Sequence, residues 1–290
     1  FMYFTDKNRI KYFKTLIETP IPERKKAREA FYLDLFLQTH EGTIWKGSSK
    51  LLDLPKQERP DFLFLDENGQ QRGLELTDWV NNTKQCRVNQ ILTDIARDIC
   101  IEVQKTKHIN LSLTIDIYDP KKWGYRTRKE FLDYVYNPGV KKLQANTKTI
   151  KKVFSDKILN SGDITEYFTT EQVEVKGQYF KLTFSKSWFN FPEFHINNNS
   201  MYWTNPTTAL QKIINCKNTK YDSYLSNCKY CDLLIIYPNY HTGNPIFSET
   251  EFPFQSHFPN IFLLYWDGED ISVTKLNISR PTDSKTAPVH

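Results

Sequence analysis

The hydrophobic positions of the first 117 residues predict two amphipathic helices and three short strands. Apolar residues recur at helical spacing in two segments and alternate or run together in three others. Asn68-Gly69 separates two of the short apolar runs, and this dipeptide is typical of a tight β-hairpin turn. The predicted order is a helix over 22–38, hairpin strands over 61–65 and 71–77, a helix over 84–107 and a strand over 111–117.

The second half of the chain predicts a return to the same kind of structure after an interruption. Residues 118–205 differ in character, with a Lys-rich helical stretch over 129–157 and β-like aromatic runs such as 179–184. Beyond them we expect a helix over 207–225, a strand over 232–237, and a hairpin of 261–266 with 271–276. We therefore expect an α/β core formed by residues 2–117 and 206–279, an inserted region over 118–205 and a frayed tail over 280–290.

Composition narrows the class of protein. Of the 290 residues, 39% are hydrophobic and 14% aromatic, which excludes a disordered chain. No run approaches the roughly 20 apolar residues that span a membrane, and we find no signal peptide. The five cysteines have no framework spacing, so we expect a cytoplasmic protein. The net charge of +5 permits a polyanionic partner without requiring one.

Two acids of the predicted hairpin are candidates for a metal site. Asp61 begins one strand, and Glu75 lies near the end of its partner. Because the two strands run in opposite directions, both positions fall at the same end of the hairpin. Carboxylates that converge repel each other unless a cation lies between them, and Mg²⁺ prefers such oxygen ligands. The ordinary alternative is that Glu75, which alternates with Leu74 and Leu76, faces solvent.

The same residues resemble a known family. A Pro-Asp pair on one strand and Glu-x-Lys on the next is the signature of the PD-(D/E)XK nucleases, which Pro60-Asp61 and Glu75-Leu76-Thr77 match except at the last position. The resemblance covers about residues 22–117, with a weaker match over 207–237. It implies a restriction-endonuclease-like mixed central sheet flanked by helices, whose core order is helix, three strands, helix, strand. It further implies phosphodiester hydrolysis with Mg²⁺ or Mn²⁺ held by Asp61, Glu75 and the Leu76 carbonyl.

The departure from this signature is Thr77, which occupies the position of the motif lysine. A neutral hydroxyl cannot supply the positive charge of that lysine, so another residue must do so or the site is inactive. Lys217 is our candidate, because it lies in an otherwise apolar stripe of the predicted helix 207–225. Ile214, Lys217, Lys220 and Tyr224 also match the helix spacing of divergent family members. The alternative is a lysine that only extends along the protein surface.

Further acids belong to the candidate site through the resemblance. Family members often carry an acid on the first helix, and Glu29 is the first candidate there, with Asp34 second. A solvated charge beside Arg28 is the ordinary interpretation of Glu29. Asp78 either extends the metal site or caps the following loop.

Basic residues and cysteines give weaker signals. The lysines that we expect to contact a nucleic-acid backbone are Lys141, Lys142, Lys148, Lys151, Lys152 and Lys220. A solvated helix face explains the lysines between 141 and 157 equally well. Cys228-Lys229-Tyr230-Cys231 has the spacing of half a zinc site but no second pair, so ordinary thiols beside a strand are the simpler interpretation.

Together these features predict a metal-dependent endonuclease that acts on DNA, in defence against foreign DNA or as a toxic effector. The catalytic candidates are Asp61, Glu75, Thr77, Lys217 and Glu29. One alternative is a catalytically silent nuclease-like domain that binds nucleic acid or a protein partner, which Thr77 favours. Another is an interaction protein whose partner surface is the region 118–205. Many enzymes of the family act as dimers, so a homodimer is compatible with this hypothesis.

Overall fold

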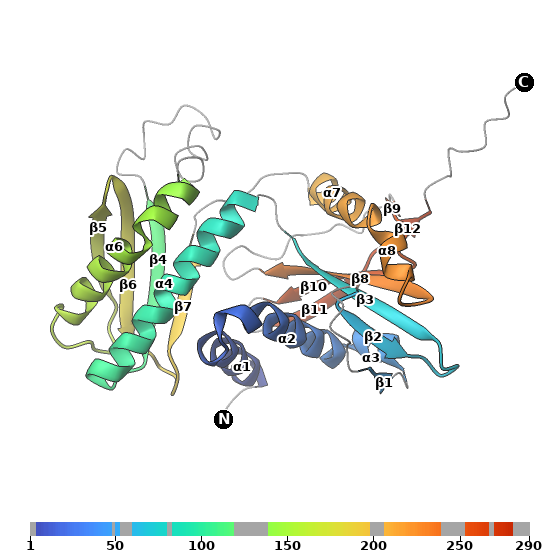
Figure 1. Ribbon diagram of the computed structural model, residues 1–290. Helices are drawn as coiled ribbons and strands as arrows, with labels where there is room; N and C mark the ends of the chain where they lie inside the picture. Colours follow the sequence, from blue (N-terminus) through green and yellow to red (C-terminus); the bar gives the residue numbers. More distant parts are fainter. Residues whose placement is uncertain are drawn as a thin grey trace, which may run out of the picture. The chain divides into compact units, whose positions relative to one another are not determined.

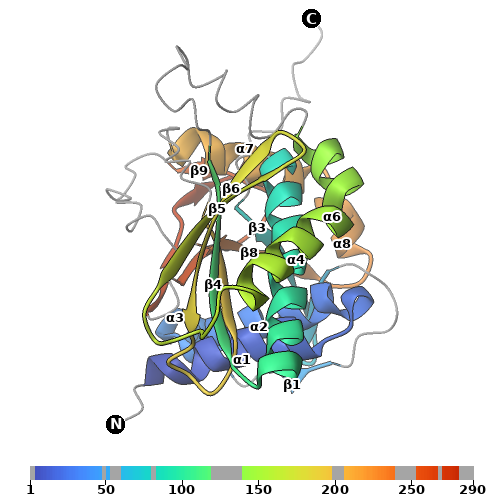
Figure 2. The same ribbon diagram turned by 90° about the vertical axis from the view of Figure 1, so that its left-hand side faces the viewer.

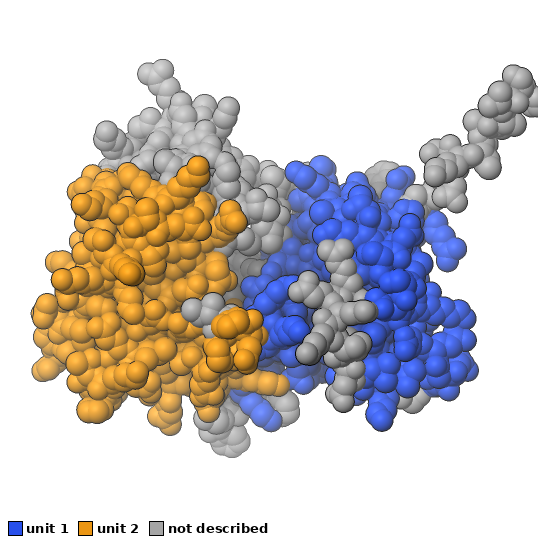
Figure 3. Space-filling model, viewed as in Figure 1, with its two compact units in different colours: residues 1–9, 25–81, 202–290 blue, residues 10–24, 82–201 orange. Residues whose placement is uncertain are grey.

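The computed structural model describes residues 4–47, 50–52, 60–79, 83–118, 139–197, 206–238, 253–266 and 270–280. The chain forms two compact units, coloured separately in Figure 3. The first unit comprises residues 1–9, 25–81 and 202–290, and the second comprises residues 10–24 and 82–201. The predicted class, a mixed α/β protein with a central sheet flanked by helices, is confirmed.

The first unit contains a six-stranded mixed sheet (Figure 1). In sheet order the strands are β1 (Lys50–Leu51), β2 (Phe62–Leu65), β3 (Gln71–Asp78), β8 (Tyr230–Pro238), β10 (Ile261–Trp266) and β11 (Ile271–Lys275). β1, β2 and β3 are successively antiparallel, whereas β8 lies parallel to both β3 and β10. The hairpins predicted around Asn68-Gly69 and between β10 and β11 are both present.

Helices cover both faces of this sheet. On one face lie α2 (Arg24–Gln38) and α3 (His40–Lys46) (Figure 1). Their aromatic side chains contact those of the strands. Phe31 packs on Trp266, and Trp45 lies edge-on to Phe64 with ring centroids 4.9 Å apart. On the other face lie α7 (Pro206–Asn218) and α8 (Tyr221–Leu225). A short parallel pair, β9 (Phe254–Gln255) with β12 (Ile278–Ser279), completes the unit.

A buried polar cluster on the α2–α3 face joins three of these elements and Asn260, the residue before β10. Asp232 of β8 is fully buried and forms an ion pair with Arg72 of β3 at 2.9 Å. The same carboxylate accepts hydrogen bonds from Trp45 Nε1 at 2.7 Å and from Asn260 Nδ2 at 2.8 Å. The guanidinium of Arg72 also lies over the Trp45 ring. Because each donor comes from a different segment, Asp232 fixes α3 and the start of β10 to the centre of the sheet.

The second unit is a four-stranded sheet with two long helices on one face. Its strand order is β5 (Thr169–Val175), β6 (Gln178–Lys186), β4 (Leu111–Tyr118) and β7 (Glu193–Asn197). Figure 2 shows α4 (Thr83–Lys107) and α6 (Gly139–Leu159) side by side across this sheet. Two further helices lie in the described part of the chain, α1 (Phe4–Glu18) and the short 3₁₀ helix η1 (Ile21–Glu23). Among the described helices, none is both long and apolar enough to cross a membrane.

The boundary between the units differs from the one expected from sequence. The predicted core included residues 82–117, but α4 and β4 belong to the second unit. The reason is strand pairing: β4 forms a continuous ladder with β6 from Leu111 to Tyr118 and lies parallel to β7, not beside the hairpin. The sequence between β3 and α7 is therefore one large insertion, longer than the expected 118–205.

Two predicted helices also differ in extent. The helix expected over 207–225 is interrupted, since α7 ends at Asn218 and α8 begins at Tyr221. The Lys-rich helix expected over 129–157 is present as α6 from Gly139, while residues 129–138 lie outside the described part of the chain. The expected tail over 280–290 lies outside it as well, apart from Arg280.

Candidate active site

The hairpin brings Asp61 and Glu75 together, as the antiparallel register requires. Phe62 pairs with Leu74, so the next positions along the ladder, Asp61 and Glu75, face each other. Asp61 Oδ2 accepts a hydrogen bond from the Leu76 main-chain N–H at 2.8 Å, which ties this side chain to β3. Glu75 is only 5% exposed. The alternative of a solvent-facing Glu75 is therefore wrong, because α7 and α8 cover that face of the sheet.

Lys217 and Tyr224 hold Glu75 from these two helices. Lys217 Nζ lies 2.6 Å from Glu75 Oε1 and 3.4 Å from the Leu76 carbonyl oxygen. Tyr224 donates its hydroxyl to the same Oε1 at 3.0 Å. The lysine proposed from the apolar stripe of the helix thus reaches the candidate site and places its positive charge against Glu75.

Sequence reasoning placed Tyr224 on this stripe but did not include it among the site residues. Tyr224 falls seven positions after Lys217, which is two helical turns. This spacing could have identified Tyr224 as a neighbour of Lys217 at the site. The side chain is fully buried, so its hydroxyl needs a partner, and Glu75 is that partner.

Two acids of the site, Asp61 and Glu29, have a raised pKa. Burial, followed by the charges of Glu75 and Glu29, raises the pKa of Asp61 to about 7. Burial likewise raises the pKa of Glu29 on α2, against the opposing effects of Lys25 and Arg28 and with a further contribution from Glu75. Glu29 therefore belongs to the same electrostatic cluster as the hairpin acids, although its own ion pair is with Lys25 at 3.4 Å.

The other acids proposed for the site have different partners. Asp78 forms an ion pair with Arg28 of α2 at 2.6 Å. Asp34 accepts a hydrogen bond from Gln38 one turn further along α2. Thr77 is half-buried two residues beyond Glu75 and so lies on the same face of β3. Of the acids considered on α2, the structure brings Glu29 to the hairpin carboxylates.

The donor set fits a hard divalent cation. Glu75 Oε2 is buried and has no hydrogen-bond partner among the described residues. Together with the Asp61 carboxylate and the Leu76 carbonyl, it offers the oxygen ligands that Mg²⁺ and Mn²⁺ prefer. Within the described ranges, no three or more His, Cys, Asp or Glu side chains cluster as a metal site. The candidate set accordingly consists of two carboxylates and one main-chain oxygen.

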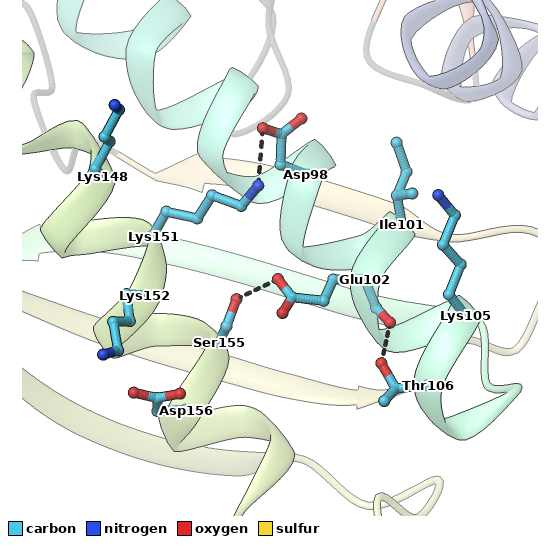
Figure 4. A pocket seen from close by; sticks show the side chains of 10 residues that line it. All are labelled: Asp98, Ile101, Glu102, Lys105, Thr106, Lys148, Lys151, Lys152, Ser155 and Asp156. Atoms are coloured by element: carbon cyan, nitrogen blue, oxygen red, sulfur yellow. Dashed lines mark hydrogen bonds and ion pairs between the residues drawn. The ribbon is translucent and has the colours of Figure 1, made fainter.

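The lysines proposed to bind nucleic acid belong to both units. Lys220, at the start of α8 in the first unit, is exposed. In the second unit, α4 and α6 border a groove of about 630 Å³ (Figure 4). The lysines that line it are Lys105, Lys148, Lys151 and Lys152. Lys151 pairs with Asp98 at 3.2 Å, whereas Lys141 and Lys142 are exposed near the start of α6.

Replacing Lys217 by methionine is expected to lower the free energy of unfolding by about 1.5 to 3 kcal/mol, the usual contribution of a charged hydrogen bond. The loss arises because Glu75 remains buried without its cation. Urea denaturation measures it. Lys220→Met, three residues further along and exposed, is the matched control and should change little. The double variant Lys217→Met/Glu75→Gln should recover most of the stability; a purely additive double variant would contradict the pairing.

The fold and the site define a class of protein: a mixed α/β protein with a buried glutamate, a half-buried aspartate and a lysine at the end of a β-hairpin. Comparison with known proteins adds no member to that class. No protein-family model, no curated protein and no solved structure matches the chain.

Proposed function

We propose that the first unit is a metal-dependent nuclease that hydrolyses phosphodiester bonds in DNA. The observation that carries the proposal is the Asp61 carboxylate next to Glu75, whose Oε2 is buried without a hydrogen-bond partner among the described residues, beside the ammonium of Lys217. Buried acids that are held close together destabilise a fold, so their presence favours a functional explanation.

The element order of the first unit supports the same proposal. The helix α2 is followed by three antiparallel strands, β1 to β3, then by α7 and the parallel strand β8. This is the order that the resemblance to PD-(D/E)XK nucleases implies, once residues 82–201 are treated as the insertion. On this basis we propose a restriction-endonuclease-like arrangement, with Glu75 on β3 and Asp61 immediately before β2.

Each residue of the site has a distinct part in the proposed reaction. Asp61, Glu75 and the Leu76 carbonyl hold Mg²⁺ or Mn²⁺, which when bound activates water and offsets charge on the phosphoryl group. Lys217 supplies the positive charge that Thr77 lacks, directed at the nucleophile or the developing charge. Tyr224 and Leu76 orient the two carboxylates.

Metal removal tests this proposal. The full chain is incubated with single-stranded and double-stranded DNA in Mg²⁺, in Mn²⁺ and in a chelator, and the products are separated by electrophoresis. We expect cleavage with either metal, none in the chelator, and recovery when metal is restored. Cleavage that persists in the chelator would contradict the metal assignment. DNA binding without cleavage at high protein concentration would instead support the alternative, a catalytically silent domain.

A further inference from the structure

The sulfurs of Cys228 and Cys231 share one small space above β3. Cys228 lies in the turn between α8 and β8, and Cys231 is the second residue of β8. A Cβ atom added to Gly73 of β3 would stand 2.9 Å from Cys228 Sγ and 3.1 Å from Cys231 Sγ. The two thiols are also hydrogen-bonded to each other. The glycine thus leaves room for a pair of adjacent thiols.

The two thiols differ in access. Cys228 lines a cavity of about 690 Å³, together with Leu52, Leu63 and Leu225. Cys231 is completely buried. A small reagent that enters the cavity therefore meets Cys228 first.

The two thiols also differ in acidity. The hydrogen bond with Cys231 lowers the pKa of Cys228, and the Gly73 N–H lowers it further, against the opposing effect of burial. The same thiol–thiol hydrogen bond and burial raise the pKa of Cys231. A thiol of lowered pKa that lines a cavity, beside a completely buried thiol, is the arrangement of a nucleophile with a resolving partner.

We propose that Cys228 and Cys231 form a reversible dithiol–disulfide site that reacts with hydroperoxides. The Cys228 thiolate attacks a peroxide oxygen, the O–O bond breaks, and Cys228 becomes a sulfenic acid while one water or alcohol leaves. Cys231 then attacks the Cys228 sulfur, the S–S bond forms, and the sulfenic oxygen leaves as water. The two thiols lose two electrons and two protons, and one hydroperoxide is reduced.

The site is connected to the candidate active site through Tyr224. The Cys228 thiol lies 3.3 Å from the Tyr224 carbonyl oxygen, to which it donates, and the Tyr224 hydroxyl donates to Glu75. Disulfide formation removes that thiol hydrogen and draws the Cys228 sulfur toward β8. Oxidation accordingly weakens the support of Glu75, and reduction restores it. This consequence rests on the proposed nuclease function, whereas the thiol chemistry does not.

Site-resolved alkylation of the full chain tests the proposal. The reduced protein is titrated with hydrogen peroxide, its free thiols are blocked, and the reversibly oxidised cysteines are reduced, labelled and located by mass spectrometry. We expect Cys228 and Cys231 to be oxidised in equal amounts, about tenfold faster than Cys216 and Cys100. Cys216 is the exposed control and Cys100 the buried one. Equal rates at all four cysteines, or oxidation of Cys216 with the pair unchanged, would overturn the proposal.

Serine variants separate the two roles. In Cys231→Ser, Cys228 should accumulate as a sulfenic acid that dimedone traps. In Cys228→Ser, Cys231 should remain reduced; disulfide formation by Cys231 with another thiol at the wild-type rate would contradict its role as the resolving partner. If the chain cleaves DNA, peroxide should lower the rate reversibly in the wild type, and Cys228→Ser should be resistant. A chain that forms the disulfide but cleaves nothing would contradict the nuclease proposal alone.

Discussion

Replacing Asp61 by asparagine is expected to reduce metal-dependent DNA cleavage by about a thousandfold while leaving the fold intact. Metal ligation contributes several kcal/mol to such reactions, and about 4 kcal/mol corresponds to this factor. Asparagine retains an oxygen that accepts from the Leu76 N–H, so the local structure is preserved. Cleavage rates under single-turnover conditions measure the effect. Glu67→Gln, at an exposed acid in the turn of the same hairpin, is the matched control and should cleave normally.

The same variant should be more stable than the wild type when metal is absent and the pH is high. The pKa of Asp61 is raised from 3.8 to about 7 in the folded state, so its contribution to stability is fully present below about pH 4. That contribution is lost as the pH rises through about 7. We therefore expect Asp61→Asn to exceed the wild type at pH 8 by on the order of 1 to 4 kcal/mol, and by less at pH 5.

Denaturation in a chelator at the two pH values measures this difference. Added Mg²⁺ should stabilise the wild type and not the variant, since a ligand stabilises only the state that binds it. If Asp61→Asn cleaves DNA at the wild-type rate, or if the stability difference is the same at pH 5 and pH 8, Asp61 is not the metal ligand with a raised pKa that we propose.

The sequence was sufficient to predict the acid pair because its geometry is local. Asp61 and Glu75 are joined by a short hairpin whose turn is held by the Asp66 side chain and by Gly69 at φ 72°, and antiparallel pairing then fixes which positions face each other. Lys217 required a longer inference, from helical spacing alone. Its neighbour on the apolar stripe, Tyr224, was harder to assign, because a tyrosine on such a stripe is ordinarily a core residue.

The unit boundary could not be predicted in this way, because it depends on pairing between distant segments. β4 alternates apolar and polar residues, which is compatible with either sheet. Its partner β6 lies some seventy residues further along the chain, and nothing in the local pattern of β4 specifies it. The element order implied by the resemblance led us to expect α4 and β4 beside the hairpin, whereas they belong to the second unit.

The burial of Asp232 and its hydrogen-bond partners could not be predicted from the sequence either. In the sequence it is the residue that opens an apolar strand, and such residues are ordinarily solvated. In the structure it is fully buried, where its carboxylate accepts from Arg72, Trp45 and Asn260. These donors are separated from it by 28 to 187 residues, so no spacing rule identifies them.

Replacing Asp232 by asparagine is consequently expected to lower the free energy of unfolding by about 3 to 5 kcal/mol, the usual cost of breaking a buried ion pair. The hydrogen-bond partners of the Asp232 carboxylate are donors, so the N–H₂ of an asparagine side chain would face a donor instead of an acceptor. The neutral amide also leaves the charge of Arg72 without its partner. Urea denaturation monitored by tryptophan fluorescence measures the loss, and Trp45 reports directly on the cluster.

Asp222→Asn, an exposed acid on α8, is the matched control and should change stability by less than about 0.5 kcal/mol. The double variant Arg72→Met/Asp232→Asn should be more stable than the sum of the single effects predicts, because each single variant leaves a buried group without its partner. Because Asp232 lies on the opposite face of the sheet from Glu75, the metal response of any folded Asp232→Asn should be retained. A near-neutral Asp232→Asn, or one that folds but has lost its response to Mg²⁺, would show that the buried cluster does not hold the sheet as proposed.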